Sequence, residues 1–276
     1  TAYTTGGKNV KCTVTVKGKI SDSSISAIKT QSYTGKAVSP APAVTYGGKK
    51  LVKNTDYTVS YSKNTAIGQA SVKITGKGLY KGTKTVNFNI RPATVTKLKV
   101  SSTGEKSVKL SWKKVTGADS YAIYRYDNTS KKWHRIKTVK AVSFTDSGLA
   151  RAKWYSYKVK AVKKTGGKEY ISASYSKAVE AVTKPAKASC TAKSAGSGSI
   201  EVSWKAVGGA SGYEIYSSSN GSDYVKSAKV GGSQKSAIVS GFEPYSLRMV
   251  KVRAYKTANG KTSYGAFSQA VMVIVR

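Results

Sequence analysis

Residues 74–85, ITGKGLYKGTKT, combine glycine and lysine as a loop that cradles phosphate does. A P-loop requires G-x-x-x-x-G-K-[ST], but Thr83 stands where its lysine belongs. The dinucleotide pattern G-x-G-x-x-G starts at Gly76 and Gly78, and then Lys81 occupies its third glycine position. Both motifs also open a helix, whereas the following TVNFNI alternates as a strand. We therefore predict turn and bulge glycines, with Tyr80 packed at the end of a sandwich, and no cofactor.

Acid–base and metal chemistry find few suitable residues. The chain has one histidine, His134, which cannot form a His-based pair, a triad or a metal cluster without partners. Alternation on a strand turns Trp133 and His134 to opposite faces, which favours a solvated histidine. Acidic residues such as Asp127, Asp146 and Asp223 lie in turn-like contexts, and no calcium-loop motif occurs. These observations predict no catalytic residue, no metal site and no enzyme.

Two further chemistries involve residues far apart in the chain. Cys12 and Cys190 are separated by most of the sequence, which favours two unpaired thiols over a disulfide. Asp56, Asn64 and the many lysines could supply an intramolecular Lys–Asn isopeptide bond. An intact mass short by one ammonia would reveal such a bond.

Charge is the most extreme property of the chain. It has 48 basic residues and 12 acidic ones, a formal net charge of +36, and only 7 of the basic residues are arginine. Such a field attracts polyanions, although dispersed lysine is also typical of a solubilising surface. Scarce arginine disfavours specific nucleic-acid recognition. No apolar run reaches the ~18 residues of a membrane span, and a beginning without Met suggests a piece of a longer protein.

A repeat of domain size occupies the second part of the chain. LSWKKVTGADSYAIY at 110–124 matches VSWKAVGGASGYEIY at 202–216, an offset of 92 residues. The offset places Trp112 on Trp204 and Tyr121 on Tyr213. Each copy contains short period-2 runs separated by Gly, Asp and Asn turns, which predicts an antiparallel sandwich.

These residues resemble fibronectin type III domains over 93–276. The resemblance implies that Trp112, Trp204, Tyr121 and Tyr213 are structural residues. It also implies that Tyr155, six residues after Leu149, is a tyrosine-corner residue whose hydroxyl bonds back to the backbone. In the second copy Arg248 stands at the corner position.

The first part of the chain resembles other surface modules. YTGK (33–36), DYTVSY (56–61), ITGKGLYKGT (74–83) and FNI (88–90) are similar to a small β-sandwich repeat of Gram-positive surface proteins. Within it, alternating Tyr57, Val59 and Tyr61 predict a strand. AYTTGGKNVKCTVTVKG resembles the closing hairpin of a bacterial immunoglobulin-like group 2 domain, with Cys12 in its core.

The predicted fold class is therefore all-β: three tandem antiparallel β-sandwich modules, immunoglobulin-like and fibronectin type III, in an elongated array. We expect residues 1–19 to be the terminal hairpin of a truncated immunoglobulin-like domain and residues 20–91 to be the small repeat. Residues 92–184 and 185–276 are each expected to be a fibronectin type III domain. Short linkers with one proline each, IRPAT and TKPAK, predict semi-rigid joints.

A ligand site is predicted on the middle module. Alternation turns Trp154 outward together with Ser156, Lys158 and Lys160, and Trp133 and Tyr126 are expected on a neighbouring strand. Trp154, Trp133, Tyr126 and Lys158 are thus the candidate ligand-binding residues. The competing interpretation is a set of aromatic rings partly buried under lysine stems or against a neighbouring module.

The resemblances imply a non-catalytic segment of a secreted or cell-wall-attached bacterial multidomain protein. It would be a semi-rigid spacer and presentation rod that binds anionic wall polymer or glycan weakly, beside other domains of the parent chain. The alternative is a dedicated carbohydrate- or protein-binding adhesin region that uses the aromatic face and contacts a glycan or host surface protein. Neither function requires specific nucleic-acid binding or a membrane span.

Overall fold

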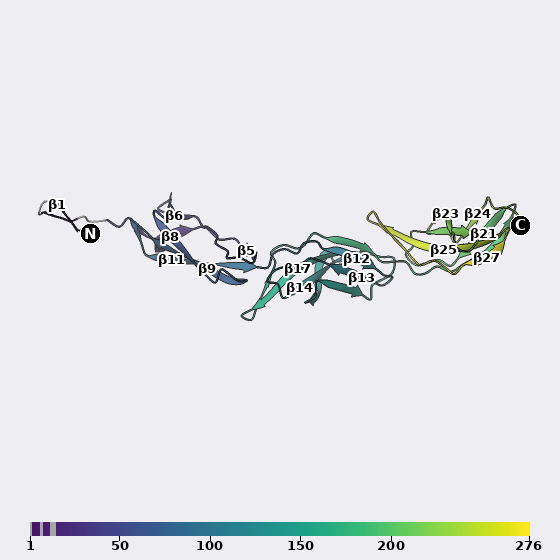
Figure 1. Cartoon of the computed structure of the whole chain (residues 1–276), viewed down its shortest axis with the longest axis horizontal. Coiled ribbons are helices and arrows are strands. Elements are labelled where there is room, and N and C mark those ends of the chain that lie inside the picture. The colour runs from purple at the N-terminus through teal and green to yellow at the C-terminus, as the bar shows by residue number, and fades with distance from the viewer. Residues whose placement is uncertain (1, 6–7, 12–14) are drawn as a thin grey trace. The chain divides into compact units, whose positions relative to one another are not determined.

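The computed structural model describes residues 2–5, 8–11 and 15–276, and it is built of strands. Its helical structure in these residues is a single 3-10 turn, η1 (Ile20–Asp22), so no described helix is long and apolar enough to cross a membrane. The all-β prediction is confirmed (Figure 1). Cys12 lies outside the described residues.

The chain divides into two compact units. One contains residues 1–95, 114–122 and 160–175, and the other contains 96–113, 123–159 and 176–276. This division does not follow the expected boundaries near residues 92 and 185, so the module boundaries stay a prediction. Below, the first, middle and third sandwiches are the sheets formed by β3–β11, β12–β19 and β20–β27.

The first sandwich contains one four-stranded sheet and smaller strand pairings. In the sheet, β9 lies between β8 and β11, and β5 pairs with β11 in parallel. Preceding this sandwich, β1 pairs with β2 as an antiparallel hairpin. The strands of this part are β1 (Ala2–Thr5), β2 (Lys8–Lys11), β3 (Gly18–Lys19), β4 (Ser24–Ile25), β5 (Gln31–Ser32), β6 (Val44–Tyr46), β7 (Lys49–Lys50), β8 (Tyr57–Ser62), β9 (Gly68–Gly76), β10 (Tyr80–Lys81) and β11 (Thr83–Arg91).

The glycine- and lysine-rich stretch 74–85 contains the end of β9, the turn that includes β10, and the start of β11, so a turn lies here as predicted. Gly78 and Gly82 have positive φ angles of 62° and 81°. A Cβ at Gly76 would lie 2.6 Å from the backbone oxygen of Tyr80, so only glycine allows this approach. Tyr80 is buried in a core that includes Tyr57 and Ile74, and its ring packs edge-on against Tyr46.

The middle and third sandwiches repeat one topology. Each has a three-stranded sheet, β12-β13-β16 or β20-β21-β24, and a larger sheet, β15-β14-β17-β18 or β23-β22-β25-β26. A fifth strand, β19 or β27, pairs with β17 or β25. The strands of the middle sandwich are β12 (Lys99–Thr103), β13 (Ser107–Ser111), β14 (Ser120–Asp127), β15 (Lys132–Val139), β16 (Ser143–Ser147), β17 (Trp154–Thr165), β18 (Lys168–Ile171) and β19 (Val179–Val182). Those of the third are β20 (Cys190–Gly196), β21 (Ser199–Trp204), β22 (Gly212–Ser218), β23 (Val225–Gly231), β24 (Ser236–Val239), β25 (Leu247–Ala258), β26 (Lys261–Tyr264) and β27 (Val271–Ile274).

Equivalent residues anchor both sandwiches. Trp112 and Trp204 are each buried to 6% exposure, and Trp204 packs against Tyr213 with ring centroids 5.1 Å apart. The Tyr121 hydroxyl accepts a hydrogen bond from the backbone N–H of Val115 at 2.9 Å. In the third sandwich the Tyr213 hydroxyl accepts one from Val207 at 2.7 Å, which is the same contact 92 residues later. Each tyrosine hydroxyl therefore accepts a backbone N–H of the loop that precedes its own strand.

We expect Tyr121→Phe and Tyr213→Phe each to destabilise their own sandwich by about 1–3 kcal/mol, because each leaves a backbone N–H without its acceptor. Native-state hydrogen exchange of the Val115 and Val207 amides measures this locally. Tyr245→Phe, at an exposed side chain, serves as the control. Unchanged protection of both amides would contradict the assignment.

Candidate functional site

The four predicted ligand-binding residues meet on one face of the larger middle sheet. Tyr126 extends from β14, Trp133 from β15, and Trp154 and Lys158 from β17. The Tyr126 ring lies 5.3 Å from that of Trp133 and 6.5 Å from that of Trp154, between centroids. The Lys158 ammonium lies 4.3 Å from the Trp133 ring centroid. These four residues are called the aromatic row.

The aromatic row is half-buried, and its members cover one another. Lys158 covers a face of Trp133, and the indole nitrogen Nε1 of Trp154 is buried without a hydrogen-bond partner among the described residues. The expectation that Ser156 faces solvent is wrong, because its exposure is 4%. Ser156 pairs with Glu180 on β19, and its hydroxyl donates to the backbone oxygen of Val179 at 3.5 Å, so the neighbouring strand accounts for its burial.

The opposite face of the same strands carries an ionic network. Arg125 Nη1 on β14 lies 2.7 Å from Asp146 Oδ2, and the Tyr157 hydroxyl donates to the same oxygen at 2.9 Å. Asp146 was expected in a turn, which is wrong: it lies within β16 and is buried. Its pairing with β13 turns it inward, where Arg125 neutralises it. Burial, and then the negative charge of Asp146, raise the pKa of Tyr157 far above its ordinary value of 10.0.

The corner positions of the two repeats differ. In the middle sandwich the Tyr155 hydroxyl accepts a hydrogen bond from the backbone N–H of Ala150 at 2.9 Å. In the third sandwich the guanidinium of Arg248 lies 5.1 Å from the ring centroid of Phe242. A cation–ring contact thus replaces a hydroxyl–backbone contact near this corner.

The histidine lies in a turn-closing cluster. The His134 side chain is 56% exposed and borders a shallow pocket of about 280 Å³. Ser130 Oγ lies 3.0 Å from His134 Nε2 and donates its proton to Asp127 Oδ2 at 2.8 Å. The Ser130 hydroxyl thus bridges the Asp127 carboxylate and the His134 ring. The backbone N–H of Thr129 and then Ser130 stabilise the Asp127 carboxylate and lower its pKa, as in a hairpin turn.

Residues considered for other chemistry have ordinary contacts. Asn64 Nδ2 donates to the backbone oxygen of Val38 at 3.1 Å, and Asp56 Oδ2 accepts from the backbone N–H of Val52 at 2.8 Å. The Cys190 thiol is half-buried and lies 3.1 Å from Ser268 Oγ. In the described part of the chain, no three His, Cys, Asp or Glu side chains gather where they could hold a metal ion.

Sequence reasoning missed a buried ion pair in the third sandwich. The Glu214 side chain on β22 is 2% exposed, and its Oε2 accepts from Arg253 Nη2 at 2.7 Å and Nε at 2.9 Å. Lys226 Nζ approaches Oε1 at 3.4 Å. The Arg253 guanidinium also lies 4.2 Å from the Tyr264 ring centroid and 4.8 Å from that of Phe267. Burial by itself would raise the pKa of Glu214, but Arg253 and then Lys226 hold it below its ordinary 4.5.

Cations over rings recur at equivalent places in the two repeats. Lys158 over Trp133 on β17 and β15 has a counterpart in Lys251 on β25, whose ammonium lies 3.7 Å from the Tyr224 ring centroid. Lys160 lies 4.2 Å from the Tyr175 ring, as Arg253 lies over Phe267. Basic residues at alternate positions of a strand, 158 and 160 or 251 and 253, are the sequence signal that could have predicted this pattern. Its recurrence indicates that part of the aromatic row is a structural lining of the sheet.

Comparisons with known proteins give a partial sequence match and matches of low identity to solved structures. No family model matches the chain. A poly(3-hydroxybutyrate) depolymerase of Ralstonia pickettii is 44% identical over 100 residues, which are 36% of this chain and 18% of that protein. A segment of two fibronectin type III domains from chicken tenascin is 18% identical, with a TM-score of 0.40, and the match covers 67% of this chain and 99% of that one. The FN1–FN3 domains of chicken CNTN1 are 14% identical, with a TM-score of 0.37, over 92% and 97% of the two chains.

We expect Glu214→Ala to destabilise the third sandwich by about 3–5 kcal/mol, because Arg253 then lacks its buried anion. Since the folded-state pKa lies below 4.5, the stabilisation is complete above that pH and is lost as the pH falls through the folded-state value. The variant should therefore lose less further stability on acidification. Hydrogen exchange of β22 and β25 amides, measured at neutral and acidic pH, checks both effects.

Glu201→Ala is the matched control. Its partner Lys193 is 76% exposed and lies 3.0 Å away, so this surface pair should contribute less than about 1 kcal/mol. Equal losses of stability in the two variants would show that the buried Glu214–Arg253 pair contributes no more than a surface pair.

Proposed function

We propose that this chain is a non-catalytic spacer segment of a secreted or cell-surface bacterial multidomain protein, and that its lysine surface binds anionic wall polymer or glycan. The observation that carries the proposal is that many of the few carboxylates form ion pairs inside the sandwiches. Five carboxylates each form an ion pair with a lysine or arginine of their own sandwich: Asp146, Glu214, Glu105, Asp119 and Glu201. These five of the twelve acidic side chains are therefore engaged in ion pairs within the fold.

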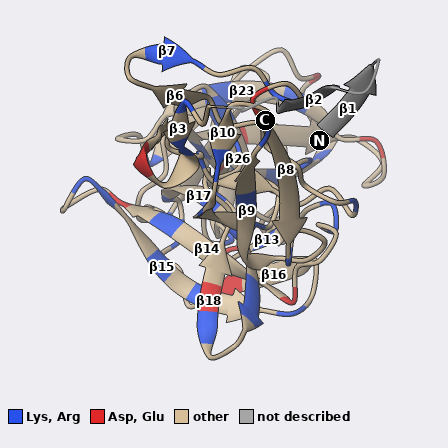
Figure 2. Ribbon diagram, turned by 90° about the vertical axis from the view of Figure 1, so that its left-hand side faces the viewer, with Lys and Arg blue, Asp and Glu red and all other residues tan. Residues whose placement is uncertain are grey.

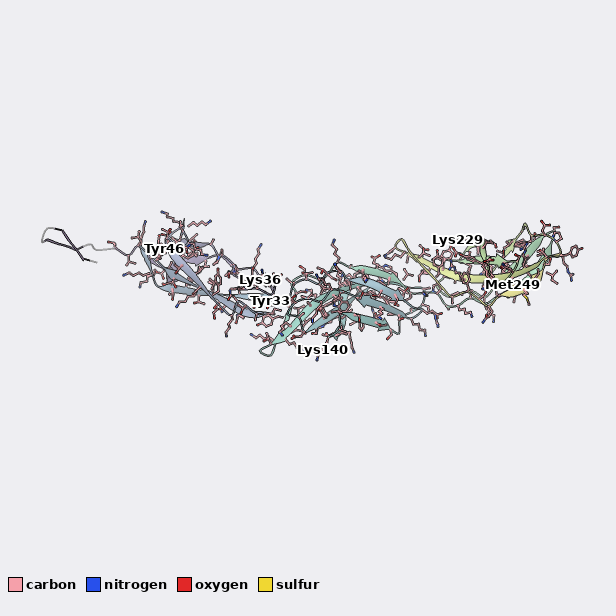
Figure 3. All side chains as sticks on the ribbon, in the orientation of Figure 1. Tyr33, Lys36, Tyr46, Lys140, Lys229 and Met249 are labelled. Atoms are coloured by element: carbon pink, nitrogen blue, oxygen red, sulfur yellow. The ribbon has the colours of Figure 1, made fainter. Side chains whose placement is uncertain are left out.

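Most of the lysines, by contrast, have no carboxylate to pair with, because 48 basic residues share 12 acidic ones. Figure 2 shows the basic residues distributed over many strands, with β7 and β15 among the most marked. Exposed lysines follow the edge strand β15 and its ends, and Lys140 is labelled in Figure 3. A charged edge blocks pairing with another sheet and also faces any polyanion that approaches.

The comparisons support the multidomain setting. The match to part of a bacterial poly(3-hydroxybutyrate) depolymerase suggests that modules of this kind accompany an enzyme that acts on a polymer. We place this chain in such a role as a segment that positions other domains, outside the cell. The prolines at its two joints support stiffness between modules.

We expect the full chain to bind heparin and inorganic polyphosphate at low salt, with log Kd rising linearly with log salt, and to ignore uncharged dextran. Isothermal titration calorimetry over a salt series measures this. The same preparation, incubated with a poly(3-hydroxybutyrate) film, should release no soluble product. Absence of polyanion binding at low salt would overturn the binding role, and release of product would overturn the non-catalytic role.

The second candidate is a dedicated carbohydrate- or protein-binding adhesin region, with a glycan or host surface protein as partner. It is favoured by the convergence of Tyr126, Trp133, Trp154 and Lys158 on one sheet face. Aromatic side chains with a polar neighbour provide large contact areas for such ligands.

This second function predicts a glycan hit on an array that persists at high salt and is lost in Trp133→Ala. Tyr224→Ala removes the equivalent ring of the third sandwich and should leave that binding intact. Equal loss in both variants, or no salt-resistant hit, argues against the aromatic row as a site.

A further inference from the structure

The outer face of the three-stranded middle sheet concentrates lysines. On β13 and just beyond it, Val108, Leu110 and Trp112 are buried, so the alternating Lys109 and Lys113 face outward. On the neighbouring strand Lys99 lies directly opposite Ser111. The backbone N–H of Lys113 donates to the oxygen of Thr96 at 3.1 Å, which places Lys113 beside Lys97. We call Lys97, Lys99, Lys109 and Lys113 the lysine face.

Three of these lysines surround a groove. A cavity of about 310 Å³ is lined by Lys97, Lys99, Ser111, Trp112 and Lys113. Lys97, Lys99 and Lys113 are exposed, while Trp112, whose side chain belongs to the core, is only 6% exposed. The Ser111 hydroxyl lies 2.7 Å from that of Ser101, which adds hydroxyl groups next to the ammonium groups. The groove therefore combines positive charge with hydroxyl groups.

The lysines that line the groove have no neutralising carboxylate among the described residues: no Asp or Glu forms an ion pair with Lys97, Lys99 or Lys113. Like charges at opposed positions on neighbouring strands destabilise a sheet. An anion in the groove would remove this repulsion and gain attraction to several ammonium groups at once.

The third sandwich provides an internal comparison. Its equivalent groove, about 290 Å³, is lined by Ser189, Cys190, Thr191, Ser203, Trp204 and Lys205. At the offset of 92, Ser189 and Thr191 replace Lys97 and Lys99, and Glu201 replaces Lys109. Glu201 pairs with Lys193 at 3.0 Å. The groove thus belongs to the fold, whereas the dense positive charge belongs to the middle sandwich.

We infer that the lysine face binds a linear phosphate polymer. Alternate residues on a strand stand about 6.6–6.8 Å apart and neighbouring strands about 4.8 Å apart, so the ammonium groups repeat at the spacing of closely placed anions. Lysine recognises phosphate as a point charge, without the planar geometry that arginine requires. The Trp112 ring is buried, so no open ring is available there for stacking on bases. This inference rests on the proposed polyanion binding and assigns it a place.

The decisive experiment exchanges the two grooves. Lys97→Ser with Lys99→Thr gives the middle groove the residues of the third, and the control Lys132→Ser with Lys137→Thr removes the same charge from β15. The probe is inorganic polyphosphate of uniform length, titrated against full chains whose folding is checked by hydrogen exchange. We expect the groove variant to lose at least about tenfold in affinity, with a salt slope smaller by about 2, and the control to lose less than about threefold.

The reverse exchange tests sufficiency. Ser189→Lys with Thr191→Lys should strengthen polyphosphate binding by creating a second such groove. Equal losses in the groove variant and the β15 control would overturn the inference but leave the proposed function intact, because binding would then be diffuse. Failure of the unaltered chain to bind any polyanion would overturn both. Tighter binding to heparin than to polyphosphate would overturn the phosphate assignment.

Discussion

A β-strand turns successive side chains to opposite faces, and the described sandwiches depend on that constraint. In each of them one set of alternate residues fills the space between sheets, as Leu110 and Trp112 do on the inner side of the middle sandwich. The other set is released from packing and can carry charge. A strand that buries Trp112 can therefore display Lys113 without any cost to the core. The extreme positive charge of the chain is compatible with its fold for this reason.

Two of the few carboxylates form buried ion pairs in the sandwiches. Asp146 and Glu214 are nearly buried, and each is neutralised by an arginine, but they lie in different positions. Asp146 faces inward beside the Tyr157 hydroxyl, whereas Glu214 lies beneath Arg253 and its surrounding rings. The two repeats thus share backbone topology and aromatic anchors while differing in their ionic contacts. Because these acids are occupied, the surface lysines are left for solvent or for polyanions.

Rings and cations on the larger sheets contribute to both structure and candidate function. The pair Lys158–Trp133 recurs as Lys251–Tyr224, so its presence alone does not indicate a ligand. Trp154 and Tyr126 extend the pattern in the middle sandwich and distinguish it from the third. At the lysine face, by contrast, both repeats have the groove, but only the middle sandwich has the concentration of lysines around it. Differences between copies of one fold are thus the more informative guide to function.

The sequence by itself determined the strand-rich class, the repeat at an offset of 92 residues and the burial of Trp112 and Trp204. It also determined the turn at 74–85, because glycine is required by positive φ and by the approach of Gly76 to Tyr80. These properties depend on local alternation and on backbone sterics, which neighbouring residues reveal. The four members of the aromatic row could likewise be proposed from alternation on adjacent strands.

Only the tertiary structure decided which side chains meet across strands. Ser156 is covered, Asp146 is buried against Arg125, and Glu214 finds Arg253 nearly forty residues later. The backbone hydrogen bond from Lys113 to Thr96, just beyond the paired β12 and β13, places Lys113 beside Lys97. Such contacts depend on strand register, and a shift by one residue would send each side chain to the other face. Alternation therefore predicts faces, whereas strand pairing creates sites.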